Sequence, residues 1–236
     1  MIDTNVYLSR WPFRRLRGDE TPELVAMLRR AGVTQAWAGS FDALLHKDIA
    51  GVNGRLADEC RRHGEGLLLP FGTVNVALPD WEEDLRRCHE VHKMAGIRLH
   101  PNYHGYGLDH PGLWKLLQAA ADRGLLVQVA LKMEDERTQH PLLRVPTLEA
   151  ALLTKPEVPG LRMMALNTFR APTVALPYDI AMIEGVAGLN RAGVERACFG
   201  SYAPFFILES AVGKLQESAV DIAVLDANAS KLLGRR

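Results

Sequence analysis

The residues best suited to chemistry stand at the ends of expected strands. Arg98 and His100 alternate along one strand, so their side chains share a face. Histidine titrates near neutral pH and can transfer protons, while arginine binds carboxylates or phosphates through paired hydrogen bonds. Asp179 belongs to a later strand and offers a second proton-transfer group. We therefore predict that His100 and Asp179 are catalytic and that Arg98 binds an anionic substrate.

The first strand, residues 2–8, has an unusually polar face. Asp3, Asn5 and Tyr7 project to one side, and apolar residues occupy most of the other side. An edge strand with one wet face would explain this pattern. The sharper interpretation places Asn5 and Tyr7 in a cavity at the carboxyl end of the strand. With the other polar residues near strand ends, the predicted substrate contacts are Asn5, Tyr7, Arg98, Arg137, Asn167 and Tyr202.

A charged loop, residues 133–141, follows the fifth expected strand. Such a loop is ordinarily a solvated surface segment, although its Glu134–Arg137 cluster can also contribute to an anion site. A metal site in this region is a further alternative. The candidate metal ligands are His100, His104, Asp135 and His140. Their spacing in the sequence fits no known metal-ligand motif.

These residues need a scaffold that gathers strand ends. Apolar segments typical of buried parallel strands alternate with helical patterns. Together with the chain length and the absence of dinucleotide and P-loop motifs, this alternation favours a single (β/α)8 TIM-barrel domain over residues 1–236. The expected strands are 2–8, 33–38, 67–76, 96–100, 125–131, 161–166, 174–183 and 196–200. The expected helices are 23–31, 42–64, 79–92, 113–123, 146–153, 185–190, 209–218 and 227–233.

The last third of this barrel has shortened connections. Between Asn167 and the seventh strand there are too few residues for a complete crossover helix, and residues 185–190 allow only a short helix. Missing helices would leave part of the barrel wall uncovered. We therefore hypothesise that the protein forms a homo-oligomer in which a second subunit covers this gap.

The overall composition predicts a cytoplasmic protein without nucleic-acid or membrane partners, and the predicted site suggests a small-molecule ligand. Its 28 basic and 28 acidic residues balance, so no charge pattern points to nucleic acid or to a membrane surface. No long apolar run predicts a membrane span, and no leader pattern precedes the first strand. Cys60, Cys88 and Cys198 lie far apart and indicate neither disulfides nor a zinc ribbon.

Four segments stand out together: IDTNVY at 2–7, GIRLHP at 96–101, FGSYAPF at 199–205 and the tail from Asn228 to Gly234. They resemble the amidohydrolase-related family, the branch that includes aminocarboxymuconate-semialdehyde decarboxylase. The resemblance covers essentially the whole chain. It implies a (β/α)8 barrel and, in active relatives, one divalent metal, usually zinc. That metal activates water or orients a carboxylate substrate.

The metal ligands of that family do not carry over. The His-x-His pair of the first strand corresponds to Asn5 and Tyr7, and the later ligands fall on Ala130, Asn167 and Tyr202. Zinc sites are built from cysteine, histidine and carboxylate side chains, which this set lacks. We therefore expect loss of the standard metal site, with no cofactor and no metal ligands in this chain.

Two functional classes remain open. The first is a hydrolase or decarboxylase that acts on a small anionic compound through an altered site. The second is a pseudoenzyme that keeps the pocket for ligand binding or serves as an assembly scaffold. A fold alone does not decide between them.

Overall fold

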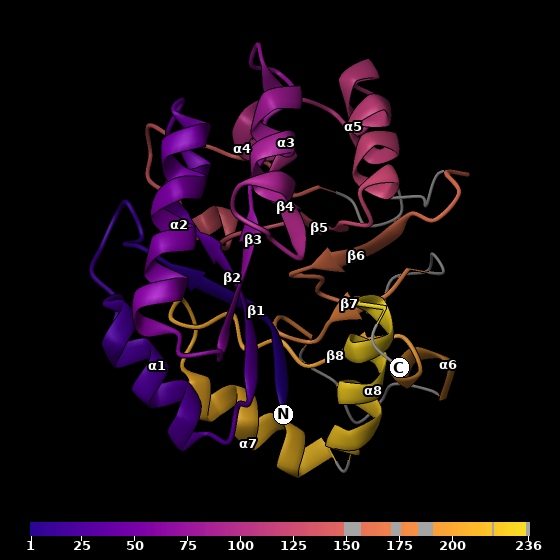
Figure 1. Cartoon of the computed structure of the whole chain (residues 1–236). Helices are drawn as coiled ribbons and strands as arrows, with labels where there is room; N and C mark the ends of the chain where they lie inside the picture. Colours follow the sequence, from indigo (N-terminus) through magenta and orange to yellow (C-terminus); the bar gives the residue numbers. More distant parts are fainter. Residues whose placement is uncertain (149–156, 171–175, 184–190, 219, 235–236) are drawn as a thin grey trace.

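The computed structural model forms one parallel barrel, and it describes residues 1–148, 157–170, 176–183, 191–218 and 220–234 (Figure 1). Eight strands follow one another around the sheet in sequence order, and every neighbouring pair is parallel. The strands are β1 (Ile2–Leu8), β2 (Gln35–Ser40), β3 (Leu68–Gly72), β4 (Gly96–Leu99), β5 (Leu126–Ala130), β6 (Arg162–Leu166), β7 (Tyr178–Asp179) and β8 (Ala197–Cys198).

Backbone hydrogen bonds between the first strand and the segment after β8 close the barrel. The amide of Thr4 donates to the carbonyl of Phe199 at 2.9 Å, and the amide of Tyr202 donates to the carbonyl of Asn5 at 2.8 Å. Because β1 thereby has partners on both sides, it is not an edge strand. This closure confirms the predicted (β/α)8 TIM barrel.

Helices surround the barrel, and local sequence signals explain several of their first turns. The carboxylates of Asp48 and Asp221 accept backbone hydrogen bonds at the starts of α2 and α8, and prolines occupy the first turns of α1 and α5. The helices are α1 (Thr21–Arg30), α2 (Ile49–His63), α3 (Trp81–Glu90), α4 (Pro101–His104), α5 (Pro111–Asp122), α6 (Arg191–Val194), α7 (Leu208–Ser218) and α8 (Ile222–Leu232), with 3-10 turns η1 (Phe41–Leu44) and η2 (Glu136–Thr138).

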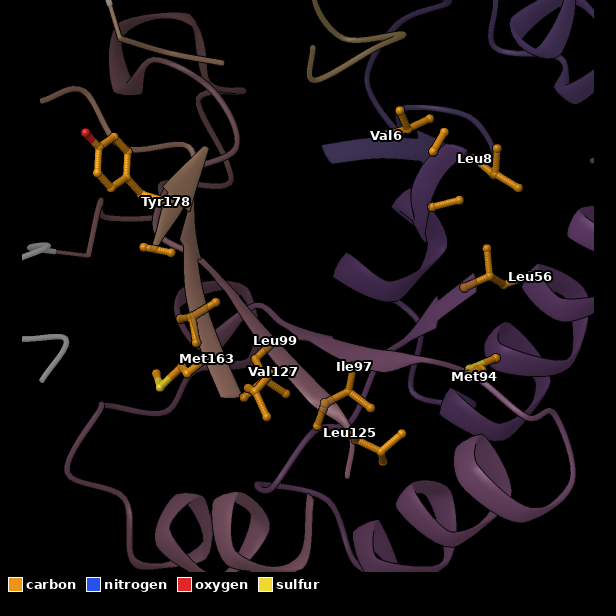
Figure 2. Close-up of a cluster of buried hydrophobic side chains, with 14 of the residues drawn as sticks. Val6, Leu8, Leu56, Met94, Ile97, Leu99, Leu125, Val127, Met163 and Tyr178 are labelled. Atoms are coloured by element: carbon orange, nitrogen blue, oxygen red, sulfur yellow. The ribbon is translucent and has the colours of Figure 1, made fainter. Parts of the chain in front are cut away.

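Two apolar cores lie on the two faces of the sheet. The outer core packs strand side chains such as Ile97, Val127 and Met163 against the helices, and Figure 2 shows part of it. The inner core fills the barrel with larger side chains, among them Trp37 and Tyr7. In the second half of β1, alternation places Val6 and Leu8 in the outer core and Tyr7 in the inner core. Ile2, on the other side of a register shift between Asp3 and Val6, also packs against the inner core.

Several element bounds differ from the sequence predictions. Helix α2 begins at Ile49 and not at residue 42, and β3 ends at Gly72 and not at residue 76. Strand β7 is two residues long instead of the predicted 174–183, and α8 begins at Ile222, five residues before the predicted start. Pro177 has no amide hydrogen for a ladder, and the Asp221 carboxylate caps α8 at its earlier start. Short helix α4, which directly follows β4, was not predicted.

Two expected helices, over 146–153 and 185–190, fall largely outside the residues that the structure describes. Residues 185–190 lie outside the described residues, as do 149–153 of the helix expected over 146–153, and the described residues 146–148 are not helical. The single-domain boundary, 1–236, stays a prediction. No helix within the described ranges is long and apolar enough to cross a membrane.

Candidate functional site

The polar face of β1 points into the barrel, where it joins residues from β6 and β7. The side-chain amide of Asn5 donates to Oδ1 of Asn167 at 2.7 Å and to Oδ2 of Asp179 at 2.6 Å. The backbone amide of Asn167 donates to the other carboxylate oxygen of Asp179 at 2.7 Å. All three residues are buried. Three strand ends that are distant in sequence therefore meet through one hydrogen-bond network.

A second polar contact links β1 to the end of β4. The Tyr7 hydroxyl lies 2.9 Å from Nε2 of His100, and the Tyr7 ring stacks on Phe41. Tyr202 meets the Tyr7 ring edge-on and donates its hydroxyl to the carbonyl of Met133 at 2.5 Å. Tyr202 has φ of 58°, a left-handed backbone that a bulky residue rarely adopts. Its side chain is thus held in place at a strained backbone position.

Arg98 spans the centre of the barrel. Its guanidinium donates to Oε1 of Gln128 at 2.8 Å and to the carbonyls of Val6 and Trp37 at 2.9 and 3.0 Å. A longer hydrogen bond reaches the carbonyl of Thr4, and the guanidinium carbon lies 4.5 Å from the centre of the Tyr7 ring. Protein groups therefore occupy four of the five N–H donors of this arginine.

Burial shifts the pKa values of the ionisable groups in this region. Removal from water raises the pKa of Asp179 to about 6, although hydrogen bonds from Asn5 and Asn167 oppose the rise. The pKa of Asp3 also rises to about 6, again mainly through burial. Burial lowers the pKa of His100 well below its usual value, with a smaller contribution from His104. His100 is therefore neutral at pH 7.

A cavity of about 670 Å³ lies at the carboxyl ends of β5 to β8. This is the end of a (β/α)8 barrel that carries active sites. The cavity combines cationic, acidic and apolar groups. Its lining comes from the loops after β1, β5, β6, β7 and β8 and from α7, and it consists of Arg14, Lys132, Glu134, Asp135, Thr138, Phe169, Ala181, Met182, Ile183, Phe205, Phe206 and Lys214.

Two side chains of this cavity are almost completely buried although both are ionisable. Lys132 is 8% exposed and places its ammonium 4.1 Å from the centre of the Phe169 ring. Glu134 is 3% exposed, and its nearest cation is Nη1 of Arg14 at 3.8 Å. Burial raises the pKa of Glu134, against a smaller lowering effect from Arg14.

A third cation of the cavity, Lys214, forms hydrogen bonds with the backbone. Nζ of Lys214 donates to the carbonyls of Ile180, Ala181 and Ile183 at 2.5, 3.0 and 3.2 Å. These bonds hold the segment after the short strand β7. Lys214 also lines a smaller adjoining cavity of about 360 Å³. A further cavity of about 610 Å³ lies on the β1–β2 side, next to α1 and α2.

The structure brings together seven of the eight residues that the sequence singled out. They gather inside the barrel, are buried and line none of the three cavities described above: Asn5, Tyr7, Arg98, His100, Asn167, Asp179 and Tyr202. The eighth, Arg137, is exposed and pairs with Asp135 at 2.8 Å. The catalytic and substrate-binding roles of all eight stay predictions.

The alternative metal ligands do not assemble among the described residues. The His100 and His104 rings are 5.9 Å apart between centres, whereas His140 stacks on Phe13 and Asp135 pairs with Arg137. Across the described ranges, no three His, Cys, Asp or Glu side chains come close enough to hold a metal ion.

Sequence reasoning missed Lys132 as a site residue and treated Glu134 mainly as part of a surface loop. Lys132 and Glu134 directly follow β5 and are separated by one residue. Polar residues at alternate positions beyond an apolar strand are the same signal that drew attention to Arg98 and His100. That signal was available here, but the many charges of the loop concealed it.

Solved structures with this barrel include several decarboxylases. A dihydroxybenzoic acid decarboxylase from Polaromonas sp., solved with manganese and the inhibitor 2-nitroresorcinol, has a TM-score of 0.73 at 11% identity, covering 99% of this chain and 96% of that one. A 5-carboxyvanillate decarboxylase from Novosphingobium aromaticivorans, with manganese and a nitrobenzoic acid, has a TM-score of 0.64 at 13% identity, with 99% and 96% covered. At such identities the likeness establishes the fold.

A 2,6-dihydroxybenzoate decarboxylase in complex with 2,6-dihydroxybenzoate gives a similar match. Its TM-score is 0.68 at 13% identity, and the match covers 98% of this chain and 99% of that one. No curated protein sequence matches the chain.

These structures correct the expectation about cofactors. The sequence predicted none, with zinc as the metal of active relatives, whereas two of the similar structures hold manganese. Replacement of the ligand positions therefore does not establish that the protein works without a cofactor. The side chains at those positions nevertheless do not fit a mononuclear metal site, because the Asn5 amide donates to Asn167 and Asp179, while Ala130 carries no donor atom.

The family model described as Amidohydrolase matches residues 7–146, more than half of the chain. The match includes β2 to β5 and only the last two residues of β1, Tyr7 and Leu8, and the observed barrel continues through β8. It agrees with the family resemblance drawn from the sequence. The chain belongs to the amidohydrolase family.

Proposed function

We propose that this protein binds a small anionic compound in the cavity at the ends of β5 to β8 and acts on it as a hydrolase or decarboxylase. The cavity has about 670 Å³, a volume that suits a compound of one or two rings. Its position at the carboxyl ends of the strands is the one that carries the chemistry in this fold.

The observation that carries this proposal is the combination of charge and aromatic surface in the cavity. Arg14, Lys132 and Lys214 supply positive charge, while the phenylalanines at 169, 205 and 206 supply a flat apolar lining. Lys214 is held by three carbonyls, whereas no described residue accepts a hydrogen bond from the side chains of Arg14 and Lys132, so these two cations can bind a ligand. An anionic group on an aromatic or other flat body satisfies both features.

The named ligands of the similar structures have the same character. 2,6-Dihydroxybenzoate and 2-nitroresorcinol are substituted aromatic rings. This likeness supports an aromatic carboxylate as the first compound class to test. His100 and Asp179 remain the proposed proton-transfer residues, and the polar side chains around them remain proposed contacts.

A turnover assay over a panel of compounds tests the proposal. The purified protein is incubated with hydroxybenzoates, other aromatic carboxylates and their lactone or ester analogues. Loss of substrate is measured by liquid chromatography, and carbon dioxide release is measured in parallel. Manganese is present in one arm, because similar structures contain it. We expect turnover of at least one anionic compound, and Lys132→Met should reduce kcat/KM at least tenfold, equivalent to about 1.4 kcal/mol.

A non-catalytic binding protein is the second candidate. It is favoured by the interior of the barrel, where Asn5, Asn167 and Asp179 hydrogen-bond one another and Tyr7 contacts His100. As part of this second candidate function, we propose that the protein has lost the standard metal site of its family. If panel compounds bind saturably but none is consumed in either arm, the enzymatic proposal is contradicted and the binding role is supported.

The expectations about surroundings accompany these proposals. A cytoplasmic location, homo-oligomerisation, and the absence of nucleic-acid and membrane partners rest on the sequence alone. The size of the protein in light scattering tests the oligomer: a strictly monomeric species would contradict association over the shortened connections.

A further inference from the structure

Lys132 holds a buried positive charge at the edge of the 670 Å³ cavity. Its side chain is 8% exposed, and within the described part of the chain no acceptor lies within hydrogen-bond distance of its ammonium. The contact with Phe169 stabilises the charge from one side. The ammonium keeps some solvent-accessible surface, and Lys132 lines the 670 Å³ cavity, so the ammonium faces that cavity. Such an ammonium requires an acceptor from water or from a ligand.

Glu134 is in the complementary position. It is 3% exposed and lines the same cavity, and no donor among the described residues forms a hydrogen bond with its carboxylate. Arg14 is half exposed and remains 3.8 Å away, too far for a hydrogen bond. The carboxylate oxygens are likewise open to the cavity.

An anion that binds to Lys132 therefore meets a carboxyl group that lines the same cavity. Two negative charges beside these largely buried side chains repel, and the group with the weaker partners takes up a proton. Lys132 can neutralise one of the two charges at close range. Arg14 lies at the surface, where water screens its pull on the second charge.

We propose that the cavity binds monoanionic carboxylates through Lys132 together with one proton, which Glu134 takes up. The neutral carboxyl group then donates its O–H to the bound carboxylate, so that Lys132 and Glu134 hold the ligand from two sides. This inference rests on the proposed location of the site, but not on any turnover. It assigns Glu134 as the residue that makes anion binding depend on pH.

Among the ionisable groups around Glu134, Glu134 is the one that we expect to take up the proton. Arg14 faces it from the loop after β1, Tyr103 from α4, and Tyr202 from the segment after β8. Burial raises the pKa of both tyrosines far above neutrality, so they stay protonated. Asp135 and Lys214 also line the cavity, but Asp135 pairs with Arg137 and Lys214 with backbone carbonyls.

Calorimetric titration with benzoate tests the proposal. At pH 7, experiments in buffers with different ionisation enthalpies should show uptake of up to one proton per benzoate. The affinity should fall up to tenfold per pH unit as the pH rises above the pKa of Glu134. In Glu134→Gln, the uptake should disappear, and benzoate should bind with the same affinity from pH 6 to pH 8. In Lys132→Met, benzoate binding should weaken at least tenfold at every pH.

Matched variants control for changes of charge elsewhere. Glu82→Gln removes an exposed carboxylate from α3, and Lys115→Met removes an exposed ammonium from α5, and neither residue lines the cavity. Both should bind benzoate as the unmodified protein does, with unchanged proton uptake. The proposal is overturned if benzoate does not bind at any pH, if it binds without proton uptake, or if Glu134→Gln retains the pH dependence. Each of these results concerns binding, so a failure of turnover leaves the test intact.

Discussion

Arg98 shows how a residue typical of ligand sites can serve the barrel itself. Its guanidinium bonds to Gln128 and to backbone carbonyls from β1 and β2, and its charge lies over the Tyr7 ring. The charge is fully buried, but the hydrogen bonds and the ring compensate it. This geometry favours a structural role, and the predicted role as a substrate ligand has a direct test.

Arg98→Met should lower the free energy of unfolding by about 3 kcal/mol or more, since each abandoned buried acceptor costs about 1–3 kcal/mol. Urea denaturation at pH 7 measures this change. The control Arg137→Met removes an exposed arginine and should change stability by less than about 0.5 kcal/mol. If Arg98→Met is as stable as the unmodified protein but no longer binds benzoate, Arg98 is a substrate ligand.

Asp179 should make stability depend on pH in a definite direction. Its pKa is about 6 in the folded protein, above its ordinary value of 3.8, because it is buried. The folded state therefore binds the proton more tightly than the unfolded state does. The contribution of Asp179 to the free energy of unfolding is fully present below about pH 4 and is lost as the pH rises through 6. At about 1.4 kcal/mol per pKa unit, the loss amounts to up to about 3 kcal/mol.

Asp179→Asn should therefore reduce the fall in unfolding free energy between pH 4 and pH 7. Asp3 has the same shift and remains in the variant, so about half of their joint pH dependence should survive. Urea denaturation across this pH range measures it, with Asp122→Asn on the exposed end of α5 as the control. An unchanged pH dependence in Asp179→Asn would show that this carboxyl group does not titrate as the structure requires.

At the level of elements, one glycine of β2 makes room for Arg98. A Cβ atom at Gly39 would lie 2.8 Å from Nη1 and 3.0 Å from Cδ of Arg98. The arginine cannot withdraw easily, because its hydrogen bonds hold it in the barrel. The close passage of the side chain over β2 therefore requires glycine at this position.

Gly39→Ala should destabilise the protein by about 1–3 kcal/mol through overpacking. Gly54→Ala provides the matched control, because a Cβ at Gly54, inside α2, meets nothing within 4 Å. That substitution should stabilise the protein by about 0.5–1 kcal/mol, since alanine suits a helix interior better than glycine. Thermal or urea unfolding of both variants tests the pair, and equal effects of the two substitutions would contradict the packing around Arg98.

Periodicity predicted most strands and the larger helices because those elements bury one regular face. It placed Asn5 and Tyr7 correctly on the inner face of β1, but it could not show that neighbours would bury them completely. Strand β7 was predicted too long, because its apolar continuation reads as strand while Lys214, distant in sequence, binds its carbonyls. Contacts between segments far apart in sequence decide both outcomes, and no local pattern records them.

For the molecule as a whole, two separate regions compete for the name of active site. The sequence and the family resemblance point to the barrel interior, where Asn5, His100 and Asp179 lie buried and hydrogen-bonded. The structure adds a cavity at the ends of β5 to β8, where no described residue forms a hydrogen bond with the Lys132 ammonium or the Glu134 carboxylate. Membership of the amidohydrolase family agrees with either region.

A crystal structure of the protein with bound benzoate distinguishes these regions most directly. We predict electron density for the carboxylate within hydrogen-bond distance of Lys132 and Glu134, with the ring against Phe169 or Phe206. Density for benzoate inside the barrel, between Tyr7, His100 and Tyr202, would contradict it.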